Sequence, residues 1–267
     1  MSALTEERQD PGWIAFRDQL ERAIGVPLAQ YKEPQLKRRL GAVMRSHGIA
    51  SWDRFAAAIA ADAALMARVR DTLTINVSEF FRQPDRFLDL RDVVIPGLLR
   101  ERRSLRIWSA GCANGCEPYT LAMILAEADP NGSHILLATD VDMPVLARAR
   151  EGRGYLPGEV RSVPPEYLRK YFVEEGGTYG VTDDVRRRVT FRRHDLLSDT
   201  YPRDMDLILC RNVVIYFTEP AKRHIYTSFA NALRPGGYLF VGGSEMIVRS
   251  HAVGLRATGT SIYRRAA

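Results

Sequence analysis

From Leu105 onward, short apolar runs alternate with amphipathic helical patterns, and this alternation constrains the fold more than any other feature. We predict strands at the following ranges: 105–109, 135–139, 189–193, 206–210 and 238–242. Helices are predicted from about Pro118, at 143–150 and at 219–233. Strands that alternate with helices predict a doubly wound, mostly parallel α/β sheet covered on both faces. Such sheets bind ligands at the carboxyl ends of their strands.

The chain before this sheet predicts a separate, small all-helical domain at residues 1–73. Residues 13–72 have helical periodicity throughout, with Phe16, Leu20 and Ile24 on one face. Ser51 is a predicted N-cap within this region. Residues 74–104 then form an ordered linker followed by a helix that begins at Pro84.

The remaining residues, 105–267, form the sheet domain, and one stretch interrupts its alternation. Between about 152 and 188 the chain carries prolines and a Gly176-Gly177 pair between short β-prone runs. This pattern predicts a β-subdomain insertion that contains a hairpin. The final segment, 256–264, is split by Gly259 and predicts a terminal antiparallel pair that closes the sheet.

Composition narrows the class of protein. Among 267 residues, 46% of them hydrophobic, there is no signal-peptide pattern and no uncharged apolar run long enough to span a membrane. We therefore expect a cytoplasmic protein that does not insert into membranes. The three cysteines, Cys112, Cys116 and Cys210, are too few for a disulfide framework and are expected to be free thiols. Cys112 and Cys116 lack a third nearby ligand, so no metal site is expected.

A glycine-bearing turn follows the first predicted strand. The segment Ser109–Pro118 contains Gly111 and Gly115, which allow a ligand to approach the backbone closely. Its spacing differs from the dinucleotide Gly-x-Gly-x-x-Gly pattern, and a plain tight turn is the alternative interpretation.

Asp140 ends the second strand, where a carboxylate can accept hydrogen bonds from both hydroxyls of a ribose. The alternative is a helix N-cap, a role that Asp142 fits better. The chain has no pyrophosphate or triphosphate motif. A nucleoside without phosphates is therefore favoured, and S-adenosylmethionine is the commonest cofactor of that kind.

Arg211 and Asn212 directly follow the apolar strand 207–210, and Tyr216 lies shortly after them. Two donors and a phenol at the end of a strand can orient an acceptor group. A core aromatic beside Phe217 is the alternative for Tyr216. The Asn/Asp-Pro-Pro-Tyr/Phe turn expected of nucleic-acid amino-methyltransferases is absent from this position.

Five sequence blocks together resemble the chemotaxis receptor methyltransferase family, CheR, over almost the whole chain. They are the following segments: 76–82 (NVSEFFR), 108–120, 138–142 (ATDVD), 210–217 (CRNVVIYF) and 242–245 (GGSE). The resemblance implies a class I S-adenosylmethionine-dependent methyltransferase. Its activity would be O-methylation of glutamate side chains on the cytoplasmic helices of chemoreceptors, giving glutamyl methyl esters and S-adenosylhomocysteine.

The resemblance also implies site residues, carried over by matching positions. The cofactor-binding residues would be Asn76, Ser78, Arg82, Glu117, Asp140, Asp195, Leu196, Arg211 and Asn212. Ser78 stands where the family often has threonine, and Asp195 where asparagine is common. Arg82 and Tyr216 are the expected catalytic residues, with Arg82 holding one carboxylate oxygen of the acceptor and Tyr216 hydrogen-bonding near the acceptor or the methyl group.

A basic stripe on the predicted second helix suggests how a partner docks. Lys37, Arg38, Arg39 and Arg45 would attract the clustered glutamates of chemoreceptor cytoplasmic domains. The short Glu174–Thr178 turn departs from the glycine loop of members that bind a receptor C-terminal pentapeptide, which counts against that interaction. Two alternatives remain: a nucleic-acid methyltransferase, suggested by the basic cluster at 186–193, and a non-catalytic cofactor-binding scaffold.

Overall fold

The computed structural model describes residues 10–73 and 78–266. The chain divides into two compact units. The first, which we call the helical unit, is Met1–Ile75 with Tyr216–Ala221, and the second, the sheet unit, is Asn76–Ile215 with Lys222–Ala267. Among the described residues, no helix has the length and apolar character needed to cross a membrane.

Within the described residues 10–73, the helical unit consists of α1 (Pro11–Ile24), η1 (Leu28–Gln30), α2 (Glu33–Ser46), α3 (Trp52–Ala61) and α4 (Ala63–Leu73). The helical character predicted for 13–72 is therefore confirmed as a series of helices. Gly25 ends α1 in the left-handed conformation, with φ of 70°. The predicted cap is confirmed, because the Ser51 side chain accepts a hydrogen bond from the Arg54 N–H at 3.5 Å.

Aromatic rings fill the centre of the helical unit. Phe16 stacks on Phe55 with ring centroids 5.3 Å apart, and Trp13 meets Trp52 edge-on at 4.9 Å. Trp13, Phe16 and Phe55 are buried. The apolar face that the sequence predicts for the first helix therefore forms the core of this unit.

The sheet unit contains a seven-stranded sheet with the order β5-β2-β1-β6-β7-β9-β8. The strands are β1 (Arg106–Ala110), β2 (Ile135–Asp140), β5 (Val189–Arg193), β6 (Met205–Cys210), β7 (Leu233–Val241), β8 (Leu255–Gly259) and β9 (Ile262–Arg265). The first five are parallel to one another, and β9 pairs antiparallel with both β7 and β8. The predicted doubly wound sheet and its terminal antiparallel pair are confirmed.

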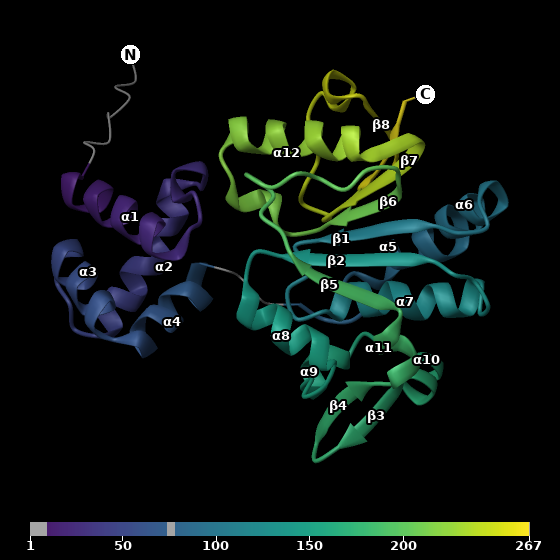
Figure 1. Cartoon of the computed structure of the whole chain (residues 1–267), viewed down its shortest axis with the longest axis horizontal. Helices are drawn as coiled ribbons and strands as arrows, with labels where there is room; N and C mark the ends of the chain where they lie inside the picture. Colours follow the sequence, from purple (N-terminus) through teal and green to yellow (C-terminus); the bar gives the residue numbers. More distant parts are fainter. Residues whose placement is uncertain (1–9, 74–77, 267) are drawn as a thin grey trace. The chain divides into compact units, whose positions relative to one another are not determined.

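Helices cover both faces of this sheet. Figure 1 shows α12 (Glu219–Ala232) on one face and α7 (Cys116–Ala128) with α8 (Met143–Glu151) on the opposite face. Nearly every residue of α7 is buried, since this helix is apolar all around. Before the sheet, α5 (Pro84–Asp89), the π-helical turn η2 (Leu90–Val94) and α6 (Ile95–Glu101) follow one another directly.

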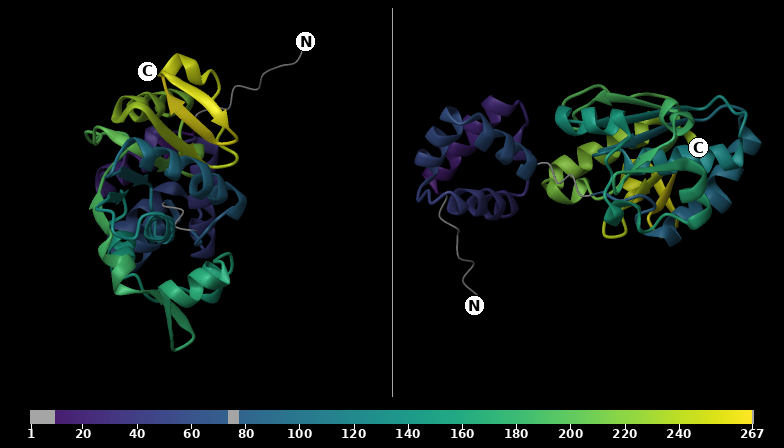
Figure 2. Two further views of the ribbon diagram at one scale, coloured as in Figure 1. Left: turned by 90° about the vertical axis from the view of Figure 1, so that its right-hand side faces the viewer. Right: turned by 90° about the horizontal axis from the view of Figure 1, so that it is seen from below.

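The predicted insertion between β2 and β5 is confirmed as a small subdomain. It comprises α9 (Pro157–Val160), α10 (Pro165–Tyr171), β3 (Phe172–Glu175), β4 (Thr178–Val181) and α11 (Asp183–Arg187). Gly176 and Gly177 join β3 to β4 with φ of 57° and 75°, the left-handed pair of a tight hairpin turn. Figure 2 shows this hairpin projecting away from the main sheet.

The segment Tyr216–Ala221 belongs to the helical unit, although it follows β6 in sequence and includes the first residues of α12. The Lys32 N–H donates to the Tyr216 carbonyl at 2.9 Å, and the Thr218 N–H donates to the Gln30 carbonyl at 2.8 Å. The Phe217 ring meets the Tyr31 ring edge-on, with centroids 4.7 Å apart. The chain therefore leaves the sheet unit after Ile215, contributes to the helical unit, and returns to form α12.

Candidate cofactor and active site

The glycine turn after β1 brings two strand ends close together. Gly111 and Gly115 have φ of 78° and 90°, which favour glycine. A Cβ on Gly111 would lie 2.5 Å from a methyl group of Val213, in the turn after β6. The N–H groups of Gly111 and Cys112 both donate to the Thr139 carbonyl, at 2.8 and 2.9 Å. The ends of β1, β2 and β6 therefore meet at this turn.

The carboxylate of Asp140 connects the first two turns of the sheet. Its Oδ2 accepts a hydrogen bond from the Ala113 N–H at 2.9 Å, and its Oδ1 accepts one from the Asp142 N–H at 3.0 Å. Burial raises the pKa of Asp140 above its ordinary value, although these N–H groups act in the opposite direction. Asp142 occupies the N-cap position of α8 without a capping bond from its side chain.

Glu117 and Arg211 form a buried ion pair behind these turns. Glu117 Oε2 lies 3.6 Å from Arg211 Nη1, and Glu117 Oε1 accepts a hydrogen bond from the Ser109 hydroxyl at 2.8 Å. The Arg211 guanidinium carbon lies 4.9 Å from the ring centroids of both Phe87 and Phe240. Burial raises the pKa of Glu117 and lowers the pKa of Arg211, since both charges leave water.

Arg211 also fixes the backbone around Arg82. Its Nη2 donates to the Arg82 carbonyl at 2.7 Å and to Gln83 Oε1 at 2.9 Å. Phe81 and Gln83, on either side of Arg82, have φ of 53° and 61°, an uncommon conformation for residues other than glycine. The Phe81 N–H donates to the Thr120 hydroxyl at 3.1 Å. This part of the linker is therefore held in one conformation by long-range contacts.

The loop after β5 carries Asp195 and Leu196, which are both buried. Asp195 Oδ1 accepts a hydrogen bond from the Leu197 N–H at 2.8 Å, and the Asp195 N–H donates to Asp199 Oδ2 at 2.9 Å. The Leu196 carbonyl accepts from the Tyr201 hydroxyl at 2.7 Å. These bonds close the loop on itself at the carboxyl end of β5.

The turn after β6 holds Asn212 in the left-handed conformation, with φ of 60°. Its side-chain Oδ1 is buried and has no hydrogen-bond partner among the described residues, so an incoming donor can satisfy it. The backbone of this turn donates hydrogen bonds to the carboxylate of Glu245. Glu245 lies in the GGSE block of the family resemblance, which assigned it no role; an acidic residue shortly after a Gly-Gly pair is the signal in the sequence.

Ser78 and the three cysteines lie in or beside this site. The Ser78 side chain acts on the Cys116 thiol and lowers its pKa, against the larger effect of burial. Cys112, Cys116 and Cys210 are free and buried, as expected, and burial raises the pKa of each, which keeps the thiols neutral. Asn76 lies outside the residues that the structure describes.

Tyr216 and the basic stripe of α2 lie in the helical unit. The Arg39 guanidinium carbon lies 5.9 Å from the centroid of the Tyr216 ring, and Arg39 Nη1 donates to the Leu73 carbonyl at 3.3 Å. Lys37 pairs with Glu33 at 2.9 Å. Arg38 and Arg45 are exposed and form no ion pair with any described residue. The stripe therefore divides into residues with local contacts and residues open to a partner.

The polar groups at the carboxyl ends of β1, β2, β5 and β6 suit a nucleoside cofactor. Asp140 offers carboxylate oxygens, and Asn212 offers an unsatisfied amide oxygen. The glycine turn packs closely against Val213, which brings the end of β1 against the turn after β6. The strand order places these groups together at the switch point between β1 and β6, where strand order reverses. The fold and the site define a doubly wound α/β methyltransferase that binds S-adenosylmethionine.

Comparison with known proteins specifies the family. Residues 76–262 match the CheR methyltransferase, SAM binding domain, and residues 12–74 match the CheR methyltransferase, all-alpha domain. The chain belongs to the CheR methyltransferase family.

Curated relatives match over most of their length. The chemotaxis protein methyltransferase of Listeria monocytogenes is 39% identical over 252 residues, which cover 94% of this chain and 96% of that protein. The chemotaxis protein methyltransferase of Listeria innocua is 38% identical over the same lengths. Chemotaxis protein methyltransferase 1 of Pseudomonas aeruginosa is 35% identical, over 87% of this chain and 89% of that protein. These relatives support S-adenosylmethionine-dependent methylation in chemotaxis.

Proposed function

We propose that this protein O-methylates glutamate side chains on the cytoplasmic helices of chemoreceptors, giving glutamyl methyl esters. The observation that carries the proposal is the position of Arg82. Its backbone is fixed by Arg211, and Arg211 immediately precedes Asn212 in the turn after β6. The Arg82 guanidinium can bind a carboxylate, and the contact with Arg211 links its backbone to the turn at the proposed cofactor crevice.

The chemistry requires orientation more than acid–base catalysis. A glutamate side chain has an ordinary pKa of about 4.3, so the acceptor is already ionised at neutral pH. S-adenosylmethionine supplies an electrophilic methyl group on a sulfonium: a C–O bond forms as the C–S bond breaks, and no proton moves. The protein must therefore hold a bare carboxylate in line and exclude water from it.

The proposed catalytic residues supply this orientation. The guanidinium of Arg82 holds one oxygen of the acceptor carboxylate by a charge-assisted hydrogen bond, which leaves the other oxygen free to react. The Tyr216 hydroxyl hydrogen-bonds near the acceptor or the methyl group. Neither contact removes the charge of the acceptor, which would lower its reactivity.

For the cofactor, we assign roles from the contacts that each side chain retains. Asp140 accepts from the ribose hydroxyls, and Asn212 offers its unsatisfied Oδ1. The further proposed cofactor-binding residues are Asn76, Ser78, Arg82, Glu117, Asp195, Leu196 and Arg211. Arg211 and Glu117 pair with one another within the core, and Arg211 also donates to the Arg82 carbonyl, so their support for the cofactor acts through the shape of the turn.

Docking is assigned to the exposed part of the basic stripe. Arg38 and Arg45 are seven positions apart on α2, hence on one side of the helix, and both are exposed. Clustered glutamates on a receptor helix present the complementary charge. Lys37 and Arg39 contribute positive potential from positions that are already in local contact.

The decisive experiment mixes the protein with S-adenosylmethionine carrying a labelled methyl group and with purified cytoplasmic fragments of chemoreceptors. We expect label in the fragment, released as methanol in base because methyl esters hydrolyse readily. A fragment with its glutamates replaced by alanine is the control. Label that resists base, or that enters RNA in preference to the receptor fragment, would contradict the proposal.

A further inference from the structure

The carboxylate of Glu245 binds an unusual number of backbone donors from two turns. Its Oε2 accepts hydrogen bonds from the N–H groups of Asn212 and Gly242, each at 2.7 Å. Its Oε1 accepts from three consecutive N–H groups of the turn after β6, those of Val213 at 3.0 Å, Val214 at 2.9 Å and Ile215 at 3.3 Å. Glu245 is buried, so these bonds are shielded from water.

The surrounding backbone is shaped around this carboxylate. A Cβ on Gly242 would lie 2.5 Å from Glu245 Oε2 and 3.0 Å from the Asn212 nitrogen. The Glu245 N–H donates back to the Gly242 carbonyl at 2.9 Å. Only a glycine at position 242 leaves room for the Glu245 side chain to reach the neighbouring turn.

The bound turn is the one that carries the proposed reaction residues. Arg211 precedes it, Asn212 begins it in the left-handed conformation, and Tyr216 follows it directly. Four successive N–H groups that point at one anion fix both the curvature of this turn and the direction in which the chain leaves it. Without the anion, these buried N–H groups would have to find other acceptors, and the turn would move.

We propose that Glu245 is a positioning residue for methyl transfer, which holds the Arg211–Ile215 turn in its reactive conformation. The measurement of kcat uses methylation of a receptor fragment, so this test rests on the proposed function. A positioning role differs from a purely structural one in its effect on kcat. Loss of the Glu245 carboxylate should lower kcat more than a substitution elsewhere that lowers the stability of the fold to a similar extent.

Glu245→Gln tests the inference at nearly constant volume. The amide replaces one acceptor oxygen by a donor, which then faces N–H groups and cannot bind them. We expect kcat at saturating cofactor to fall about 10-fold to 100-fold, while KM for the receptor fragment stays within about twofold, since Arg38 and Arg45 are unchanged. Glu245→Asp keeps the charge and should restore part of kcat.

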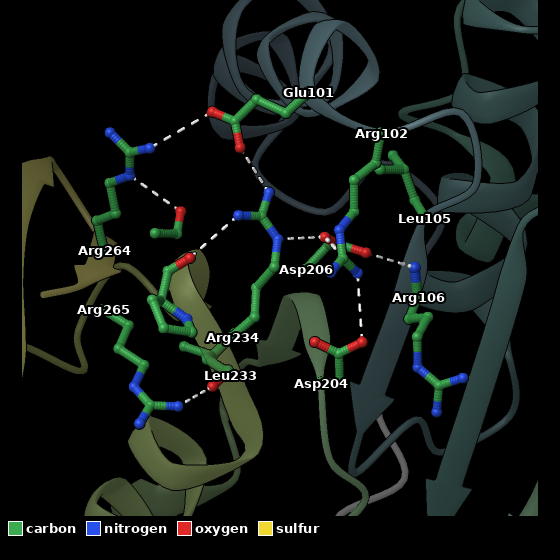
Figure 3. A network of polar contacts seen from close by, with 12 residues as sticks. Glu101, Arg102, Leu105, Arg106, Asp204, Asp206, Leu233, Arg234, Arg264 and Arg265 are labelled. Atoms are coloured by element: carbon green, nitrogen blue, oxygen red, sulfur yellow. Dashed lines mark hydrogen bonds and ion pairs between the residues drawn. The ribbon is translucent and has the colours of Figure 1, made fainter. Parts of the chain in front are cut away.

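Asp206→Asn is the matched control. Asp206 is also a fully buried carboxylate, and it accepts from the Arg106 N–H at 2.8 Å and pairs with Arg234 at 2.5 Å. Figure 3 shows it within a network with Glu101 and Arg102 at the start of β6, the opposite end of the strand from Arg211. This variant should lower Tm and leave kcat within about twofold of the wild type.

Several results would overturn the proposal. Wild-type kcat in folded Glu245→Gln is one, and an equal loss of kcat in Asp206→Asn is another, because it would indicate general destabilisation. Should Glu245→Gln fail to fold, Gly242→Ala and Glu245→Asp probe the same contact, and wild-type kcat in both would exclude the positioning role.

A separate readout distinguishes this inference from the proposed function. If the wild-type protein labels no receptor fragment, the proposed function fails, and amide hydrogen exchange then decides the role of Glu245. We expect the amides of residues 212–215 to exchange faster in Glu245→Gln than in the wild type. Unchanged exchange at these four amides would overturn the positioning role whatever the enzyme assay shows.

Discussion

Arg211 Nη2 lies 2.7 Å from the backbone carbonyl oxygen of Arg82, a residue 129 positions earlier in the chain. The contact joins the end of β6 to the start of α5. Because the Arg211 guanidinium itself packs against the rings of Phe87 and Phe240, the two arginines form a rigid unit in which one orients the backbone of the other.

Arg211→Lys should weaken this unit. Lysine keeps the charge but cannot donate from a planar fork to the Arg82 carbonyl and Gln83 together, and it lacks the planar guanidinium that packs against the two rings. We expect a loss of roughly 1–3 kcal/mol in the free energy of unfolding, measured by urea denaturation, and a loss of kcat of about tenfold. Arg264→Lys is the control, since Arg264 also donates to a carbonyl, that of Gly236, and lies 5.2 Å from a ring, but at the surface. Equal effects in both variants would contradict the assignment.

Arg82→Ala removes the proposed carboxylate-binding group and leaves the carbonyl that Arg211 contacts. The fold should therefore be retained, with circular dichroism and Tm close to the wild type. Turnover with receptor fragments should fall about 100-fold, because the acceptor loses its orientation. A wild-type methylation rate in this variant would exclude Arg82 from the reaction.

Tyr216→Phe isolates the hydroxyl. The ring that lies beside Arg39 is preserved, as is the backbone carbonyl that accepts from the Lys32 N–H. We expect most of kcat to be lost, with the unfolding midpoint nearly unchanged. If instead stability falls and kcat per folded molecule is normal, Tyr216 has only the core role considered from the sequence.

Cofactor binding should depend on pH through Asp140. Burial raises the pKa of Asp140 in the folded protein, so the carboxylate takes up a proton at a higher pH than an exposed aspartate does. The ionised carboxylate accepts hydrogen bonds from ribose hydroxyls. The affinity for S-adenosylhomocysteine should therefore be highest well above the raised pKa of Asp140 and should fall as the pH is lowered past that pKa. Calorimetry with S-adenosylhomocysteine over a pH series measures this dependence. Asp140→Asn should bind weakly and without that acid dependence; an identical pH profile in the variant would rule out Asp140 as its source.

Receptor docking should depend on Arg38 and Arg45. The double charge reversal Arg38→Glu/Arg45→Glu should raise KM for the receptor fragment about tenfold at low salt, and added salt should reduce the difference because it screens the attraction. Arg54→Glu, a reversal on α3 at another exposed position, is the matched control. Unchanged KM in the double variant, measured at low ionic strength, would eliminate α2 as the docking surface.

The sequence predicted the sheet well because local patterns specify it. Predicted strands 189–193 and 206–210 agree with β5 and β6 to within one residue. The strand predicted at 238–242 was too short, because β7 already begins at Leu233. The structure includes Pro235, Gly236 and Gly237 within β7, with Gly236 at φ of 78° and a register shift against β6.

Periodicity could not predict the contacts that position the site. Glu245 lies 30 or more positions from the N–H groups of the turn after β6, and Arg211 more than a hundred from Arg82. Such pairs meet only after the sheet forms. The surroundings of Arg39 could not be predicted from the sequence either. The sequence groups Arg39 with the basic stripe, and the structure places it beside the Tyr216 ring.

The packing of Tyr216–Ala221 within the helical unit has a practical consequence for engineering. Removing residues 1–73 to obtain a minimal enzyme would remove Tyr31 from beside Phe217 and leave an apolar segment at the start of α12 without its packing partner. Chimeras that exchange the amino-terminal domain between relatives should therefore transplant Tyr216–Ala221 along with it, so that both pieces of the graft come from one parent.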